Sequence, residues 1–267
     1  MISLVQLLRE AQNAPKAIIL AGAPGAGKSS IVDDIIADLG LKVMNIDDFF
    51  IKKLQDAGIS LDLKLADAAG RSGAGKAMAD AQKEYQDILQ QEIGAGSNIV
   101  IDGTAAAYNK TEKLKETLEA VGYDVMMVYV YAGLEKALRK NEDRFERSLG
   151  KDRSLMPAIV MQTWANVTKN FEPYLNLFGQ NFVAVSRDKD PFSLKDLEDI
   201  ITRYIEPFRP TDTKPKTEKE QAKSDADKKK LEDEIRQLRS KENVQNIVQQ
   251  TVSKEEAQNK IKQFLRS

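Results

Sequence analysis

Residues 16–31 read KAIILAGAPGAGKSSI, and this stretch decides the fold. Its first part, 16–21, is a short apolar run typical of a buried strand. The next part, GAPGAGKS at 22–29, matches the pattern G-x-x-x-x-G-K-[ST], a glycine-rich turn between a strand and a helix. We therefore predict a phosphate-binding loop that joins a strand at 16–21 to a helix at 28–39.

Each residue type in this loop suits the binding of nucleotide phosphates. The glycines permit backbone conformations with positive φ, in which successive N–H groups converge on phosphate oxygens. Lys28 supplies positive charge, Ser29 supplies a hydroxyl for Mg²⁺, and the following helix points its positive end at the anion. We predict that ATP and Mg²⁺ bind here, with contacts from Gly22, Ala23, Gly25, Ala26, Gly27, Lys28, Ser29 and Ser30.

The rest of the body alternates short apolar runs with helical patterns. Further strands are expected at 42–46, 98–102, 124–131 and 181–185, and helices near 76–93, 111–121, 133–148, 155–178 and 193–206. Strands separated by helices indicate a parallel sheet that is covered on both faces. We predict an α/β fold of the P-loop NTPase type, with a five-stranded sheet in the order 2-3-1-4-5 and ligands at the carboxyl ends of the strands.

Two acidic residues, Asp47 and Asp48, come directly after the expected strand 42–46. In this fold the end of that strand lies near the phosphate loop, where a carboxylate can accept a proton from an attacking hydroxyl. We assign this role to Asp47 and a substrate contact to Asp48. The alternative is that one of them caps a helix that begins at Phe49.

A third carboxylate, Asp102, follows the expected strand 98–102 and precedes Gly103 and Thr104. An acidic residue at this place can organise Mg²⁺ together with Ser29, and Thr104 points into the same crevice as a substrate contact. The alternative is an Asp-Gly turn that simply ends the strand.

Taken together, these residues resemble the zeta-toxin-like P-loop kinases and their polynucleotide-kinase relatives. The phosphate loop, Asp47-Asp48-Phe49 and NIVIDGT at 98–104 carry the resemblance, which covers roughly 14–190. It implies that Asp47 is the base toward a substrate hydroxyl, and that arginines on a lid between strands four and five approach the phosphates.

Residues 139–153, RKNEDRFERSLGKDR, provide such arginines. Lys140, Arg144, Arg147 and Lys151 recur on one face of the expected helix. Arginine can neutralise the transferring phosphoryl group, so we assign catalytic roles to Arg144 and Arg147, and substrate contacts to Arg139 and Arg153. The alternative is a solvated helix held by weak ion pairs.

A second glycine-rich stretch, GRSGAGKA at 70–77, has Ala77 where Ser or Thr belongs, and no strand precedes it. We reject it as a nucleotide site and expect a mobile loop that leads into the helix from 76. As an alternative, Arg71 and Lys76 of this loop contact an anionic substrate.

The amino-acid composition excludes several kinds of catalytic and metal-binding site. The 267 residues contain 40 Lys and Arg against 41 Asp and Glu, with no His and no Cys. Histidine bases, cysteine nucleophiles and His- or Cys-ligated metals are excluded, and a hard, oxygen-ligated ion such as Mg²⁺ remains. No apolar run is long enough to span a membrane and no signal peptide is recognisable, so we expect a cytoplasmic protein.

The last part of the chain differs sharply in composition. We expect a kinase domain at 1–208, a linker at 209–217 and a charged helical tail at 218–267. The tail carries short apolar stripes but no sustained heptad pattern, so it is either a solvated helix or a surface that docks on a protein partner or a second copy.

These observations predict an enzyme, a P-loop kinase that moves the γ-phosphate of ATP to a hydroxyl of a small sugar or nucleotide. One alternative is a kinase acting on a polynucleotide or on a modified DNA base, whose binding weakens steeply with salt. Another is a nucleotide-dependent assembly protein that acts through its tail.

Overall fold

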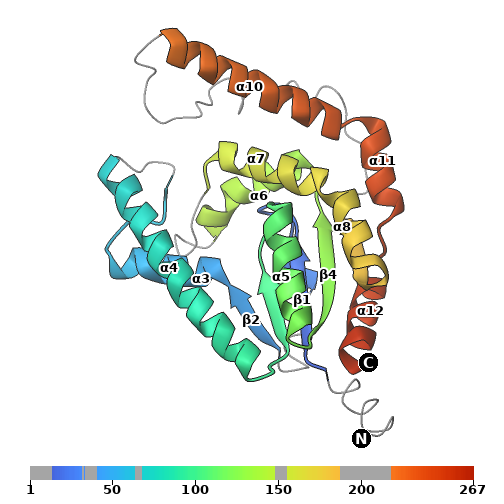
Figure 1. The fold of residues 1–267 in the computed structure, drawn as a ribbon. Coiled ribbons are helices and arrows are strands. Elements are labelled where there is room, and N and C mark those ends of the chain that lie inside the picture. Colours follow the sequence, from blue (N-terminus) through green and yellow to red (C-terminus); the bar gives the residue numbers. More distant parts are fainter. Residues whose placement is uncertain (1–13, 32, 34–40, 64–67, 148–154, 187–217) are drawn as a thin grey trace, which may run out of the picture.

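The computed structural model describes residues 14–31, 33, 41–63, 68–147, 155–186 and 218–267. Its centre is a sheet with helices on both faces (Figure 1). The expected helix at 193–206 and the linker at 209–217 lie outside the described residues. Of the expected helix at 28–39, residues 28–31 and 33 are described, and all of these except Lys28 are helical.

Five parallel strands form the sheet, in the order β2-β3-β1-β4-β5 that the sequence predicts. Their bounds are β1 Lys16–Ala21, β2 Lys42–Asn45, β3 Ile99–Asp102, β4 Asp124–Tyr131 and β5 Phe182–Ser186. The central strand is buried on both sides. Ala17 and Ile19 of β1 face one apolar cluster, and Ile18 and Leu20 face the other. Burial on both faces explains why this strand reads as an unbroken apolar run.

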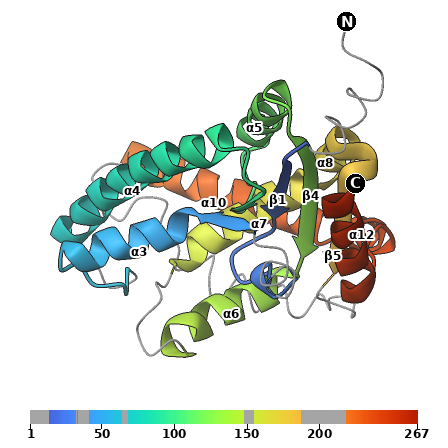
Figure 2. The same cartoon turned by 90° about the horizontal axis from the view of Figure 1, so that it is seen from below.

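The helices of the body are α3 Ile46–Asp56, α4 Ala68–Gly94, α5 Tyr108–Ala120, α6 Leu134–Arg147, α7 Pro157–Lys169 and α8 Phe171–Phe178, followed by a 3₁₀ turn at Gly179–Asn181. Figure 2 shows α4, α5 and α8 on one side of the sheet. The single helix expected at 155–178 is two helices, which meet at Asn170. The Asn170 side chain donates to the carbonyl of Ala106, 3.1 Å away, and so ties this junction to the loop after β3.

The prediction of a loop at 70–77 is wrong, because these residues belong to the first turns of α4. This helix packs against α3, and its Ala77 and Ala81 share a buried cluster with Leu54. Gly73 leaves room for the side chain of Ile59, which follows α3, since a Cβ at residue 73 would lie 2.7 Å from Cδ1 of Ile59. Of the glycines that suggested a loop, Gly73 thus has a close neighbour, whereas a Cβ on Gly75 would meet nothing within 4 Å.

The tail forms three helices, α10 Glu218–Leu238, α11 Lys241–Gln249 and α12 Lys254–Arg266. Their apolar stripes are buried on the body of the same chain, which differs from the expected solvated or partner-docking tail. One set joins the core beneath α7 and α8, and consists of Leu231, Ile235, Val244 and Ile247. A second set covers the other face of the sheet beside β5, and consists of Ala257, Ile261 and Phe264 (Figure 2).

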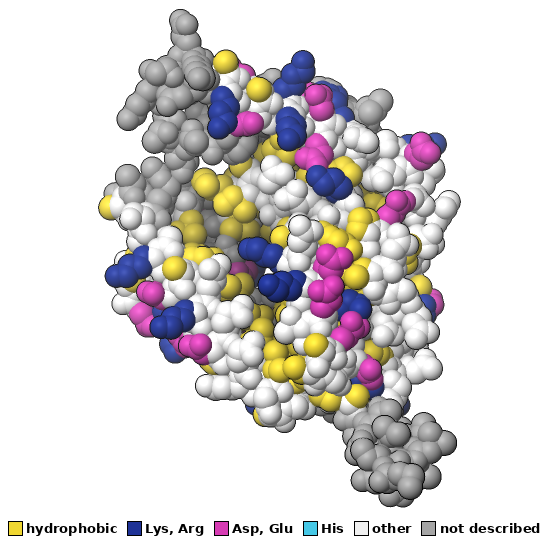
Figure 3. All heavy atoms as spheres, in the orientation of Figure 1, with side chains coloured by type: hydrophobic (Ala, Val, Ile, Leu, Met, Phe, Trp, Pro, Cys, Tyr) yellow, Lys and Arg dark blue, Asp and Glu magenta, His cyan; other side chains and the backbone are white. Residues whose placement is uncertain are grey.

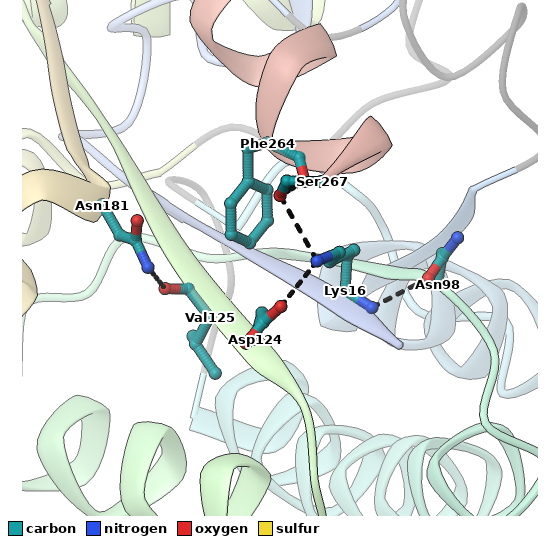
Figure 4. Close-up of polar contacts among 7 residues, drawn as sticks. All are labelled: Lys16, Asn98, Asp124, Val125, Asn181, Phe264 and Ser267. Atoms are coloured by element: carbon teal, nitrogen blue, oxygen red, sulfur yellow. Dashed lines mark hydrogen bonds and ion pairs between the residues drawn. The ribbon is translucent and has the colours of Figure 1, made fainter. Parts of the chain in front are cut away.

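The carboxyl end of the chain is fastened to the start of β1 (Figure 4). The Lys16 ammonium is paired with Oδ2 of Asp124 at 2.5 Å, lies over the ring of Phe264 and donates to Oγ of Ser267 at 3.4 Å. A backbone hydrogen bond of 2.8 Å from Val252 to Ala184 adds a further tie, at β5. The division into a kinase domain, a linker and a tail stays a prediction, but the tail helices share the core of the body.

None of the helices in the described ranges combines the length and the apolar character that crossing a membrane would require.

Candidate functional site

The phosphate loop leaves the carboxyl end of β1 and lies directly on neighbouring backbone. Gly22, Gly25 and Gly27 have φ values of 152°, 78° and 87°. A Cβ on Gly22 would lie 2.6 Å from the carbonyl oxygen of Val130, and one on Gly25 would lie 2.8 Å from that of Ala137. Glycine is therefore required at both positions, by conformation and by space. The loop is clamped between the end of β4 and helix α6.

Lys28 folds back over this loop. Its ammonium donates to the carbonyl of Gly22 at 3.2 Å and approaches that of Ala23 at 3.5 Å. Burial lowers the pKa of Lys28, while the charges of Asp102 and Asp47 act in the opposite direction. The ammonium thus contacts the loop and lies within electrostatic reach of the carboxylates that follow β2 and β3.

The two serines of the loop begin the helix that follows it. Ser29 is exposed, so its hydroxyl is open to a ligand. Ser30 donates its hydroxyl to the carbonyl of Gly27 at 2.8 Å, which holds the turn closed.

Asn45, which the sequence reading did not single out, organises the acidic residues after β2. Its carbonyl oxygen Oδ1 accepts from the backbone N–H of Asp47 at 2.9 Å and caps α3. Its amide donates to Oδ2 of Asp102 at 3.1 Å. The alternative that Asp47 or Asp48 caps the helix is therefore wrong, since both lie in its first turn. An Asn three residues before an acidic residue was an available signal for this cap.

Burial and several neighbouring charges act on the carboxyl group of Asp102. Burial raises its pKa, Lys28 lowers it, and the charges of Asp47 and Asp48 raise it further. Arg144 of α6 also interacts with Asp102, in the direction that favours the ionised form. Three strand ends and α6 thus bring charges of both signs within electrostatic reach of one another.

Tyr85 of α4 is a second site residue that the sequence reading missed. Burial and the charge of Asp102 raise the pKa of its hydroxyl to about 12. Its ring packs edge-on against Phe49, with 5.9 Å between ring centroids. In the sequence, Tyr85 is one apolar position of a long helical pattern, and nothing distinguishes it from an ordinary core residue.

The loop after β3 runs beside the phosphate loop. The backbone N–H of Gly22 donates to the carbonyl of Thr104 at 3.1 Å, and Ala105 adopts a positive φ of 53°. Thr104 is therefore at the site, where its carbonyl holds the phosphate loop in place.

Helix α6 presents one face to the phosphate loop. A Cβ on Gly25 would lie 3.1 Å from Cβ of Lys140, and Arg144, one turn further on, interacts with Lys28 and Asp102. Arg139 is exposed. Arg147 lies in α6 and Arg71 in α4, but their side chains lie outside the described part of the chain, as does all of Arg153.

The oxygen donors at this edge of the sheet suit Mg²⁺. The Ser29 hydroxyl and the Asp102 carboxylate are hard ligands of the kind that this ion prefers. Within the described ranges no three acidic side chains cluster as a closed metal cage. An ion carried by a nucleotide needs none, because phosphate oxygens and water supply its other ligands. The face drawn in Figure 3 is hollowed between α4 and α5, and Lys or Arg side chains lie at the edge of the hollow.

The chain is similar to known proteins both in its sequence family and in its fold. The family model of the zeta toxin matches residues 5–190. No curated protein matches the chain. A structure of the AvrRxo1-ORF1:-ORF2 complex matches with a TM-score of 0.51 and 16% identity, over 88% of this chain and 83% of that chain. The same pair with ATP gives a TM-score of 0.50 and 18% identity, over 69% and 62%.

The PezAT toxin–antitoxin system of Streptococcus pneumoniae matches with a TM-score of 0.46 and 17% identity, over 88% of this chain and 94% of that chain. At such identities a structural likeness concerns the fold. The family match is more specific, because it spans all five strands, the phosphate loop and the acidic residues after β2 and β3. The chain therefore belongs to the zeta toxin family.

Proposed function

We propose that this protein is an ATP- and Mg²⁺-dependent kinase that transfers the γ-phosphoryl group to a hydroxyl of a small sugar or nucleotide. One observation carries the proposal. Lys28, Asp47, Asp102 and Arg144 interact electrostatically at the carboxyl edge of the sheet, next to a phosphate loop that conformation and packing restrict to glycine. Membership of the zeta toxin family supports the same reaction class.

The phosphate loop and Lys28 would bind the nucleotide phosphates, and Ser29 with Asp102 would hold Mg²⁺. The ion supplies charge compensation at the phosphates and orients them. Arg144 approaches from α6 and adds positive charge where negative charge develops during transfer. Phosphoryl transfer depends mainly on positioning and charge, so a chain without histidine can perform it.

In the proposed reaction, Asp47 acts as the general base. It accepts the proton of the acceptor hydroxyl as the hydroxyl oxygen forms its bond to the γ-phosphorus and the bond to the ADP oxygen breaks. Asn45 fixes the backbone at Asp47 through its cap, so the carboxylate starts from a defined position in the first turn of α3.

A small acceptor fits the near-zero net charge of the chain, which provides no global attraction for a nucleic acid. The assembly alternative loses its basis, because the apolar stripes of the tail are buried on the same chain.

The direct test is transfer of label from γ-labelled ATP with Mg²⁺ to panels of UDP-sugars, nucleosides and 5′-hydroxyl oligonucleotides. We expect label in one small-molecule acceptor. Asp47→Asn should lower kcat by roughly 10²- to 10⁴-fold, as loss of a general base does, with ATP binding retained. Lys28→Ala should weaken ATP binding as well, because it removes the positive charge from the loop.

Asp56→Asn is the matched control, since Asp56 is exposed in the last turn of the same helix. It should leave transfer unchanged. Label in the oligonucleotides alone would favour the polynucleotide alternative. Equal slow hydrolysis by the wild type and Asp47→Asn, with no acceptor labelled, would contradict the role of Asp47 as the base.

A further inference from the structure

Helix α6 links the phosphate loop to the charged groups of the site. Near the start of this helix, the carbonyl oxygen of Ala137 and Cβ of Lys140 pack closely against Gly25. Further along the same helix, Arg144 interacts with Lys28 and Asp102. A small shift of the first turn of α6 would therefore move both the floor of the phosphate loop and the arginine.

That first turn is held by a residue from the other end of the chain. Arg239 directly follows α10, and its guanidinium forms an ion pair with Glu135 in the first turn of α6. The Arg239 side chain is only 2% exposed, and that of Glu135 is 25% exposed. Burial lowers the pKa of Arg239 to about 10, so the guanidinium keeps its charge near neutral pH. The pair is thus shielded from water, unlike an ordinary surface contact.

The residues around the ion pair connect it to the end of β4 and to the phosphate loop. Tyr131, the last residue of β4, interacts electrostatically with Arg239. The adjacent Ala132 carbonyl accepts a 2.9 Å hydrogen bond from the buried indole of Trp164. Gly22 meets the same strand at the carbonyl of Val130. The end of β4, the start of α6 and the phosphate loop therefore form one packed unit, and Arg239 contacts it from outside the span of the family match.

We propose that Arg239 is a positioning residue for the nucleotide site. Through its pair with Glu135 it holds the first turn of α6 against the phosphate loop and keeps Arg144 within electrostatic reach of Asp102. The segment after residue 217 would thereby be required for nucleotide binding, although it contributes no group to the phosphates. This role rests on the proposed binding of ATP and is independent of which acceptor is used.

A second ion pair between tail and body provides a control. Lys169 of α7 pairs with Glu234 of α10 at 2.7 Å, but the Lys169 side chain is 60% exposed and the contact does not involve α6. Breaking it tests whether any loss of a tail contact affects the nucleotide site.

The test compares the dissociation constant of Mg·ATP and the melting temperature in the wild type, Arg239→Met, Arg239→Met/Glu135→Met and Lys169→Ala. Arg239→Met leaves a shielded carboxylate without its counter-charge, so we expect lower stability and ATP binding weaker by about 3- to 30-fold. The double variant removes both charges and should regain stability, as buried pairs replaced by apolar residues often do. Its ATP binding should stay weaker than wild type, and Lys169→Ala should bind ATP as the wild type does.

Recovery of ATP binding together with stability in the double variant would reduce Arg239 to a purely structural residue and overturn the proposal. So would unchanged ATP binding in Arg239→Met. If Arg239→Met does not fold, the double variant alone decides between these outcomes. A wild type that fails to bind Mg·ATP would reject the proposed function itself, and the positioning role with it.

Discussion

The burial of the Asp102 carboxyl group lowers the stability of the folded protein near neutral pH. Burial raises the pKa of its carboxyl, and Lys28 offsets this only in part. A carboxyl whose pKa is higher in the folded than in the unfolded state binds its proton more tightly when folded. Ionised Asp102 therefore destabilises the fold near neutral pH, and this cost disappears as pH falls through its folded pKa toward the unfolded value of about 4.

Asp102→Asn should consequently raise the melting temperature near neutral pH, by the few degrees that ~1 kcal/mol produces in a chain of this size. The gain should shrink toward about pH 4, where the unfolded-state carboxyl is itself protonated. The Asn oxygen can still accept from Asn45, so the local hydrogen bond is retained. Thermal melts followed by circular dichroism across this pH range measure the effect.

The same substitution should weaken Mg·ATP binding, because it removes the carboxylate that we assign to the metal. A lower melting temperature of Asp102→Asn at neutral pH would mean that the pairing with Lys28 outweighs the burial of the carboxylate.

At the scale of single elements, α12 shows how an amphipathic helix completes the core. Ile261 and Phe264 are buried with Val183 and Val185 of β5, whereas Lys260 is exposed on the same helix. The helix thus covers one face of the sheet. Its apolar side chains stabilise the fold in proportion to the apolar area that they bury.

Ile261→Ala should lower the free energy of unfolding by about 2–4 kcal/mol, since it removes buried methyl groups and leaves a cavity. Lys260→Ala, which breaks only the exposed pair with Glu256, should change it by less than ~0.5 kcal/mol. Urea denaturation of both variants tests the contrast. Equal effects of the two substitutions would mean that α12 is not firmly docked on β5.

At the scale of the whole molecule, the tail and the body should unfold as one unit. The apolar side chains of α10 and α11 lie in the same cluster as Trp164, the one tryptophan of the sequence. Because tail and body share a core, loss of one removes the packing partners of the other.

Trp164 fluorescence, which reports on the body, and far-UV circular dichroism, which is sensitive to the tail helices, should therefore give coincident urea transitions. An early loss of helical signal, before the change in fluorescence, would instead indicate that residues 218–267 form a separate, weaker unit. The outcome also decides whether the composition shift near residue 209 marks a true domain boundary.

Much of the fold follows from local patterns. The strand at 16–21 and the phosphate loop could be predicted, because a buried parallel strand and a glycine-rich turn leave distinct patterns in the sequence. The strand order followed from the fold type that this loop indicates. The same locality produced the error at 70–77, where glycines that indicate a loop lie inside α4 and one of them, Gly73, faces Ile59. Asn45 was missed because its role as a helix cap was not recognised. Tyr85 was missed because its pattern is that of an ordinary core residue.

The sequence by itself determined the phosphate loop and the parallel sheet, since both leave local patterns in the chain. The residue types after β1, β2 and β3 also indicated the nucleotide chemistry that we propose. Only the tertiary structure decided where the tail packs. Periodicity shows that a helix has an apolar face, but it does not show which surface covers that face. The pairing of Glu135 with Arg239 joins residues far apart in the chain, and such contacts arise from the packing of whole elements, which no local pattern encodes.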